Sequence, residues 1–170
     1  PGKLVQILRT YGEEKFATRI VENIVKARAK APLNSTTELA TLVKESIPAA
    51  TRRTGGNPAK RTFQALRIFI NRELDDLELG LKAALQLLKP GARLAVISFH
   101  SLEDRIVKQF MQAHSKVEVP RGLPVRDKDL PQSALEIIGR VKPGELEVTQ
   151  NPRARSAIMR VAQKRIGALV

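Results

Sequence analysis

The sequence contains no cysteine, which excludes a disulfide scaffold, a cysteine-ligated zinc or iron–sulfur site and a cysteine nucleophile. Only two histidines, His100 and His114, are present, so we predict no metal site. Aromatic residues make up 4% of the chain, which disfavours a base-stacking platform of the RRM or OB type. No apolar run approaches the ~20 residues that cross a bilayer. We therefore expect no membrane association, and a cytoplasmic, reducing location fits the lack of cysteine.

What the chain has in excess is positive charge. Its 170 residues carry 30 Lys and Arg against 17 Asp and Glu, a formal net charge of +13. Hydrophobic residues at 42% and charged residues at 28% indicate a globular chain of one domain, or of one and a fraction. A surplus of this size attracts polyanions, so nucleic acid is the first partner to consider. A merely solubilising surface is the alternative.

The first half of the chain is predicted to be helical. Apolar residues recur at helical spacing over residues 3–30, where Gly12 can interrupt the pattern, and over about 35–47, where Ser35 or Thr36 can cap the helix. Residues 49–57 are predicted to form a basic loop. Leucines and isoleucines at spacings of three and four over 58–88 predict one long helix, or two joined by a kink.

The period of the pattern changes after residue 90. Residues 93–99 are short, apolar and β-branched, which predicts a strand buried on both faces, as in a parallel sheet. A helix is expected from Ser101 to about residue 114, with Ser101 and Asp104 resembling a capping box. Further strands are expected at 136–141 and 156–162. Helix, strand and helix in this order indicate an α/β fold, but too few strands are present for a complete sheet.

The positive charge is concentrated in two blocks without acidic residues. The cations of residues 50–72 and of residues 151–170 would contact phosphates and read little of the nucleic-acid sequence. The alternative is that they only form the solvated faces of helices. They are Arg52, Arg53, Lys60, Arg61, Arg67 and Arg72 in the first block, and Arg153, Arg155, Arg160, Lys164 and Arg165 in the second.

The densest group of reactive side chains is Ser98–Arg105, at the carboxyl end of the predicted strand, where open α/β sheets bind ligands. A hydrolase would use Ser98 or Ser101 as nucleophile and His100 as its base, but no Gly-x-Ser-x-Gly elbow is present. A simple helix start explains the hydroxyl and the acids, but leaves His100 without a role.

Two other groups are candidates for polyanion binding. Asn151–Ser156 carries Arg153 and Arg155, which would point the same way on an extended backbone and form a clamp for phosphate or carboxylate. A turn with exposed arginines is the alternative. Near the start of the long helical segment, one polar, basic face is predicted to present Arg61, Gln64, Arg67 and Asn71 to RNA or to a base. A solvated helix side explains the same pattern.

These motifs together resemble the RsmH (MraW) family. Its members are S-adenosylmethionine-dependent methyltransferases that modify the exocyclic N4 of a cytosine in bacterial 16S ribosomal RNA. The resemblance rests on four motifs in the same order, which cover essentially the whole chain: Tyr11–Ala17, Arg61–Ile68, Ser98–Lys108 and Asn151–Ala157.

The resemblance extends only to the C-terminal half of the family. The glycine-rich S-adenosylmethionine loop, the acid for the ribose and the strand-four motif of the family's N-terminal half have no counterpart in this sequence. The cofactor site is therefore expected mostly outside this chain, which alone should be inactive. The implied fold is α/β: a helical inserted region, then the C-terminal part of a class I, Rossmann-like sheet. Residues 1–57 would belong to the inserted substrate-recognition domain and residues 58–170 to the methyltransferase domain.

The resemblance also implies roles for residues. We expect Ser98, His100 and Ser101 to line the pocket for the unstacked base, with Glu103 and Asp104 as supporting acceptors. The partner would be 16S ribosomal RNA or the small ribosomal subunit, contacted by Arg52, Arg53, Arg61, Gln64, Arg67, Asn71, Arg153 and Arg155. A non-catalytic RNA-binding or ribosome-associated module is the alternative. An incomplete sheet exposes its edge, so a homodimer or domain-swapped association is also expected.

Overall fold

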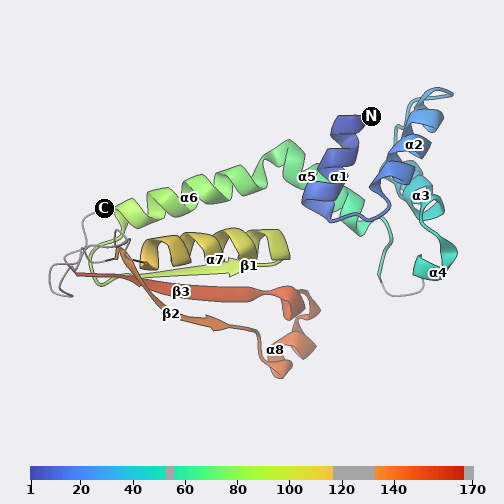
Figure 1. Cartoon of the computed structure of the whole chain (residues 1–170). Coiled ribbons are helices and arrows are strands. Elements are labelled where there is room, and N and C mark those ends of the chain that lie inside the picture. Colours follow the sequence, from blue (N-terminus) through green and yellow to red (C-terminus); the bar gives the residue numbers. More distant parts are fainter. Residues whose placement is uncertain (53–55, 117–132, 167–170) are drawn as a thin grey trace, which may run out of the picture. The chain divides into compact units, whose positions relative to one another are not determined.

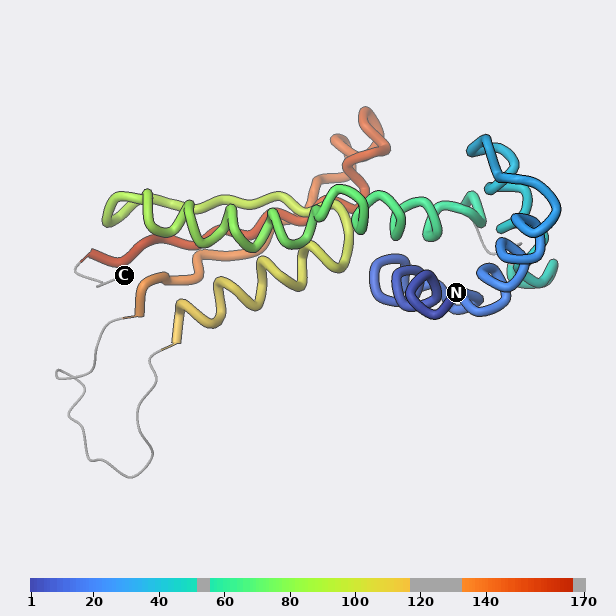
Figure 2. Tube along the Cα trace, turned by 90° about the horizontal axis from the view of Figure 1, so that it is seen from above, coloured from blue at the N-terminus to red at the C-terminus, as the bar shows by residue number. Residues whose placement is uncertain are grey.

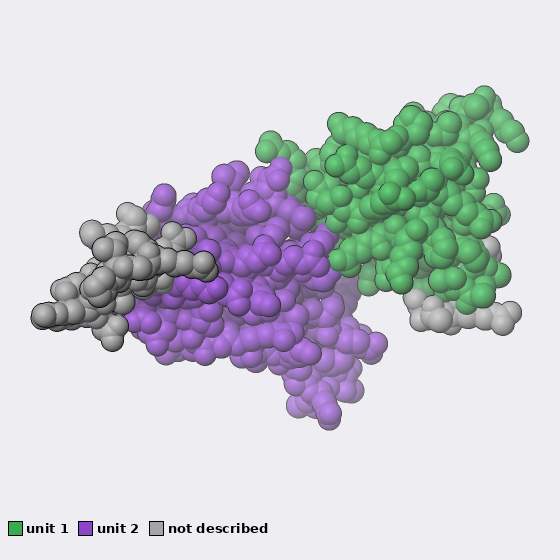
Figure 3. Space-filling model, in the orientation of Figure 1, with its two compact units in different colours: residues 1–73 green, residues 74–170 purple. Residues whose placement is uncertain are grey.

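The computed structural model describes residues 1–52, 56–116 and 133–166. The chain forms two compact units, residues 1–73 and residues 74–170 (Figure 3). The boundary expected from the sequence was residue 57, whereas the helix that follows that residue groups with unit 1. The division into domains of the whole protein stays a prediction. No helix in the described ranges is both long and apolar enough to span a membrane.

Unit 1 is helical (Figure 1). Its helices are α1 (Gly2–Gly12), α2 (Ala17–Arg28), α3 (Thr36–Ser46), α4 (Ala49–Arg52) and α5 (Lys60–Asn71). The core is formed by apolar side chains at helical spacing, including the fully buried Leu8, Ile20 and Val43. The predicted segment 3–30 is divided at Gly12, and Glu13 after it adopts a left-handed conformation with φ 49°. The short helix α4 corrects the loop that was predicted over 49–57.

Gly12 lies where α1 meets α5. A Cβ atom at this position would lie 2.6 Å from the carbonyl oxygen of Arg61 and 3.2 Å from the Cβ of Ala65. Because real Cβ atoms do not approach a backbone oxygen so closely, only glycine lets the two helix backbones come this near. The glycine therefore fixes the packing of α1 on α5 as well as the end of α1.

Local capping signals define the other helix ends of unit 1. The Ser35 hydroxyl accepts a hydrogen bond from the Glu38 amide at 3.1 Å, as predicted, and the Glu38 carboxylate accepts one from the Asn34 amide at 3.0 Å. The segment 58–88 is two helices, α5 and α6 (Glu73–Leu87), one of the two alternatives that the sequence left open. The break is at Arg72, which has a left-handed φ of 54°.

Unit 2 contains one three-stranded sheet and the helices that cover it. After α6 come β1 (Arg93–Ser98), α7 (Ser101–Ser115), β2 (Leu135–Val141), α8 (Glu145–Gln150), the 3₁₀ helix η2 (Pro152–Ser156) and β3 (Ile158–Lys164). The strand order is β1-β3-β2, and both pairings are antiparallel. Helices α6 and α7 pack on one face of this sheet (Figure 2) around the buried Leu85, Val107 and Met111.

The prediction for β1 was wrong in one respect. The strand is present, but within the described residues it pairs only with β3, antiparallel, and not within a parallel sheet. Leu94, Val96 and Ser98 face the helices, whereas Ile97 on the other face is 57% exposed. The alternation follows because α6 and α7 cover only one face. The structure supports a mixed helix and strand fold; its Rossmann-like character and its self-association stay predictions.

Lys164 connects the end of β3 to the end of α6. It is 7% exposed, and its ammonium group donates hydrogen bonds to the carbonyls of Leu85 at 3.0 Å and Leu88 at 2.9 Å. These are carbonyls of the last turn of the helix, where a cation is also favoured by the helix dipole. One cation of the second basic block is therefore used inside the fold and does not face a partner.

Candidate functional site

The carboxyl end of β1 leads directly into α7, and His100 makes this junction. Its backbone is extended, and its Nδ1 atom accepts a hydrogen bond from the Glu103 amide at 3.4 Å. The Glu103 carboxylate accepts hydrogen bonds from the amides of Phe99 at 2.9 Å and His100 at 3.3 Å. This is a capping box with histidine as the N-cap. The predicted pairing of Ser101 with Asp104 is wrong, because Ser101 is already inside the helix.

The capping role fixes the proton on the other ring nitrogen of His100. Since Nδ1 is the acceptor, the neutral imidazole carries its proton on Nε2. That Nε2 atom is buried without a hydrogen-bond partner, and so is Ser98 Oγ two residues earlier. Glu103 Oε1 lies 3.3 Å from His100 Nε2, but this contact lacks hydrogen-bond geometry. A donor and a hydroxyl are therefore left with unused hydrogen-bonding capacity at the end of the strand.

Asp104 has a different partner from the one the sequence suggested. Its carboxylate accepts two hydrogen bonds from the Arg160 guanidinium, at 2.7 and 2.9 Å, with both side chains about one-sixth exposed. The pair ties the first turn of α7 to β3. The hydrogen bonds from Arg160 lower the pKa of the Asp104 carboxyl; burial opposes the shift, and the charges of Arg160, Arg140 and Lys108 add to it. Asp104 therefore supports the site as an ion-pair partner.

We expect Asp104→Asn to destabilise unit 2 by about 1–3 kcal/mol at neutral pH, because the guanidinium of Arg160 loses its charged acceptor. The folded-state pKa is lower than the unfolded one, so this stabilisation is complete above about pH 4 and is lost as the pH falls through the folded value. Urea unfolding of both proteins from pH 7 to pH 3 should show the difference shrinking at acid pH. Asp76→Asn, on an exposed part of α6, is the control. If the difference in free energy of unfolding between Asp104→Asn and the unaltered protein stayed constant with pH, the ion pair would not be its cause.

The polar face predicted on α5 is formed, but its side chains have partners inside the chain. Arg61 and Gln64 donate to the carbonyls of Glu13 at 3.4 Å and Tyr11 at 3.3 Å, where α1 ends. Arg67 makes a two-pronged contact with Glu73 at 2.8 and 3.0 Å, and Asn71 donates to the same carboxylate. These four candidates thus help to hold α5, and their contact with RNA stays a prediction.

The other arginine candidates lie elsewhere. Arg153 and Arg155 are exposed on η2, where the Asn151 side chain accepts a hydrogen bond from the Arg153 amide at 3.3 Å. The clamp was predicted on the assumption of an extended backbone, and this assumption was wrong. In a 3₁₀ helix, side chains two residues apart point in different directions. Arg52 ends α4, and Arg53 lies outside the described residues.

Arg160 is the residue at the site that the sequence analysis did not identify. It was grouped with the basic block of 151–170, and 56 residues separate it from Asp104. No local spacing signals such a contact. Only the pairing of β1 with β3, which places Arg160 opposite Val96, brings it beside the start of α7.

The comparison with known proteins identifies the family. The model of the MraW methylase family matches residues 2–165. This chain belongs to the MraW methylase family. The resemblance seen in the sequence is thereby confirmed, and the four motifs on which it rested lie inside the matched range.

Similar proteins carry the name Ribosomal RNA small subunit methyltransferase H. The one from Polynucleobacter asymbioticus is 70% identical over 99% of this chain and 53% of its own length. That from Cupriavidus pinatubonensis is 55% identical, over 95% of this chain and 51% of the relative. The relative from Burkholderia mallei is 53% identical, over 95% of this chain and 53% of its own length. The chain thus spans about half the length of the curated relatives that it matches.

Proposed function

We propose that the protein to which these residues belong transfers a methyl group from S-adenosylmethionine to N4 of a cytosine in 16S ribosomal RNA. The observation that carries the proposal is the family match over residues 2–165, together with relatives named as small-subunit ribosomal RNA methyltransferases. The net charge of +13 supports a polyanionic substrate.

The described residues do not by themselves form a site for S-adenosylmethionine. At the end of β1 the two carboxylates are already engaged, Glu103 with backbone amides and Asp104 with Arg160. The groups that remain are the Ser98 hydroxyl and the His100 Nε2–H. A hydroxyl and one imidazole donor offer no charged partner for the amino-acid part of S-adenosylmethionine and too few groups for its ribose as well, so we derive no step through the methyl donor.

The same two groups suit a cytosine. The reacting edge of this base carries the N4 amine as a donor beside ring acceptors. An enzyme that acts on this edge needs the base outside the stack. We propose that the His100 Nε2–H donates to an acceptor on the base, while the Ser98 hydroxyl accepts from the N4 amine. Both atoms are buried in the described residues, so this contact requires the bound RNA to open access to them. Glu103 and Asp104 are positioning residues in this proposal, because they hold His100 and the first turn of α7. Ser101 lines the pocket, and Arg52, Arg53, Arg153 and Arg155 contact RNA.

The test uses the intact enzyme, small ribosomal subunits that lack the modification, and labelled S-adenosylmethionine. The RNA is digested to nucleosides and analysed by mass spectrometry. We expect the label in N4-methylcytidine and none in subunits that already carry the methyl group. Label at cytosine C5, on a ribose or on another base would overturn the proposal. The chain of residues 1–170 alone is expected to bind RNA without methylating it, which would separate a binding module from the enzyme.

A further inference from the structure

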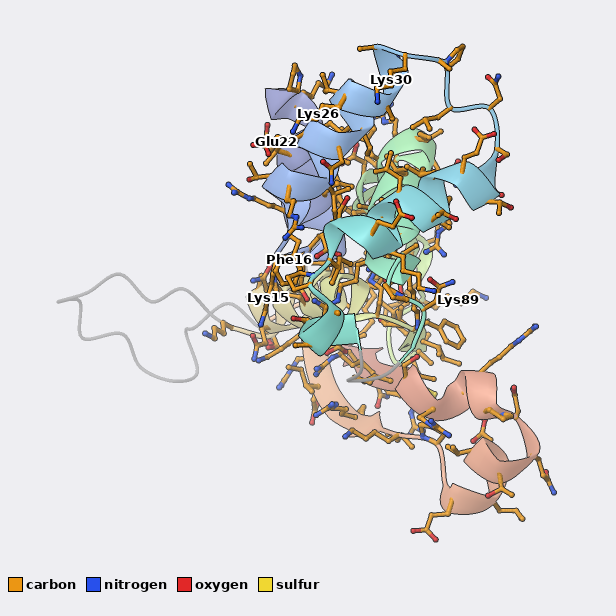
Figure 4. The ribbon with its side chains drawn as sticks, turned by 90° about the vertical axis from the view of Figure 1, so that its right-hand side faces the viewer. Lys15, Phe16, Glu22, Lys26, Lys30 and Lys89 are labelled. Carbon is orange, nitrogen blue, oxygen red and sulfur yellow. The ribbon has the colours of Figure 1, made fainter. Side chains whose placement is uncertain are left out.

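One side of α2 carries a row of cations that the sequence analysis did not use. Lys15 precedes the helix, Arg19 and Lys26 lie on it, and Lys30 follows it, and all four are exposed. Figure 4 shows Lys26 and Lys30 on the outer side of α2 near Glu22, with Lys15 at its start. Arg19 and Lys26 are seven residues apart, which places them on one side of the helix about 10 Å apart along its axis. Lys15 and Lys30 each lie four residues farther along the chain, beyond the two helix ends, and the exposed Glu22 lies between Arg19 and Lys26.

At the N-terminal end of α2, this row of cations reaches a groove in unit 1. The groove has a volume of about 410 Å³, and its lining includes Lys15, Lys60 and Arg61. One acid, Glu14, also lines it, but this residue is only 4% exposed and its carboxylate accepts a hydrogen bond from the Phe16 amide at 3.0 Å. Three cations thus surround a hollow in which the one lining carboxylate already has a partner.

The helix starts at this groove agree with its charge. Neither α2 nor α5 has an N-cap side chain that accepts a hydrogen bond or an acidic residue in its first turn, whereas α3 and α7 have both. The Glu14 carboxylate and the Asn57 side chain each accept a hydrogen bond only from the amide of the N-cap residue, at 3.0 and 2.9 Å. The positive end of a helix dipole favours anions and disfavours the cations found here. An anionic partner would compensate the cations and would also be favoured by the remaining free amides of the two helix starts.

We propose that the basic side of α2 and the groove at its start bind the sugar–phosphate backbone of the substrate RNA. The identity of the RNA rests on the proposed function. An acidic protein fits this surface less well, because protein interfaces need an apolar centre and Val25, at 44% exposure, is the large exposed apolar residue of α2. Several exposed cations beside a single large exposed apolar side chain suit phosphate contacts better than a protein interface.

The test compares two triple variants of the intact enzyme. Lys15→Gln/Lys26→Gln/Lys30→Gln removes three cations from this surface, and Lys82→Gln/Lys89→Gln/Lys142→Gln removes three exposed lysines from unit 2. The affinity for a fragment of small-subunit ribosomal RNA is measured as a function of salt, together with an unrelated RNA of equal length. We expect the first variant to bind both RNAs at least tenfold more weakly at low salt. The slope of log affinity against log salt concentration should be less steep by about 2.

Equal behaviour of the two variants would overturn the proposal, and so would a loss confined to one of the two RNAs, because phosphate contacts carry no sequence information. The first variant should also raise the KM for RNA and leave kcat at saturating RNA unchanged. Binding and its salt slope are measured without methyl transfer. A failure of the proposed function, seen as no N4-methylcytidine with the unaltered enzyme, is therefore distinguishable from a failure of this proposal.

Discussion

Replacing Gly12 with alanine is expected to destabilise unit 1 by about 1–3 kcal/mol, the usual cost of forcing a methyl group into a packed contact. The new Cβ would lie 2.6 Å from the Arg61 carbonyl oxygen, which belongs to the backbone of α5 and cannot swing away as a side chain can. α1 and α5 would have to separate. The hydrogen bonds of Arg61 and Gln64 to the end of α1 would lengthen with them.

Gly80→Ala is the matched control for this experiment. Gly80 lies on the exposed surface within α6, and nothing lies within 4 Å of the position of its Cβ. There alanine should stabilise by about 0.5–1 kcal/mol, because it improves helix propensity. Urea unfolding gives both free energies, and hydrogen exchange locates the change in α1 and α5. A Gly12→Ala protein that gains stability as Gly80→Ala does would show that the close approach is not real.

Substitutions of His100 should separate its two roles. His100→Asn is expected to keep the helix start, since asparagine is among the best N-cap residues, so the free energy of unfolding should change by less than about 0.5 kcal/mol. It removes the Nε2–H, however, and methyl transfer by the intact enzyme should fall by about 10- to 100-fold, the effect of one or two lost hydrogen bonds. His100→Ala should lose the same activity and also about 0.5–2 kcal/mol of stability.

The three proteins are compared by urea unfolding and by initial rates of methyl transfer. If His100→Asn retains full activity, the histidine is present for the helix start alone, and the unpartnered Nε2 atom has no part in the reaction. If His100→Ala is as stable as the unaltered protein, the capping contact at 3.4 Å contributes nothing. The two readouts are independent, so each role can fail separately.

Local signals in the sequence predicted most helix ends. Ser35 and Gly12 act through their own backbone and neighbours, and each starts or ends a helix where expected. The short helix α4 was missed because four residues give too little pattern to distinguish a helix from a loop.

The strand and site errors have a different cause. Whether β1 is parallel or antiparallel depends on β3, 60 residues later, and no window of sequence contains both strands. A separation of 56 residues made the Asp104–Arg160 pair equally invisible to local patterns. At the helix start, Ser101 is the more usual N-cap residue than His100, so local preference favoured the wrong residue by one position. The sequence thus identified the polar residues at the end of β1, but not their partners; their role in a functional site stays a prediction.

The strand order of the sheet also bears on how the chain folds during synthesis. β3 is the last of the three strands to be made, yet it lies between the other two and forms every strand pairing described here. A ribosome adds about 5–20 residues per second. For several seconds β1 and β2 would be made without β3, the strand with which both pair here, and Lys164 would not yet have reached the end of α6. The residues of unit 1, by contrast, are all synthesised before β1, so its core can form first.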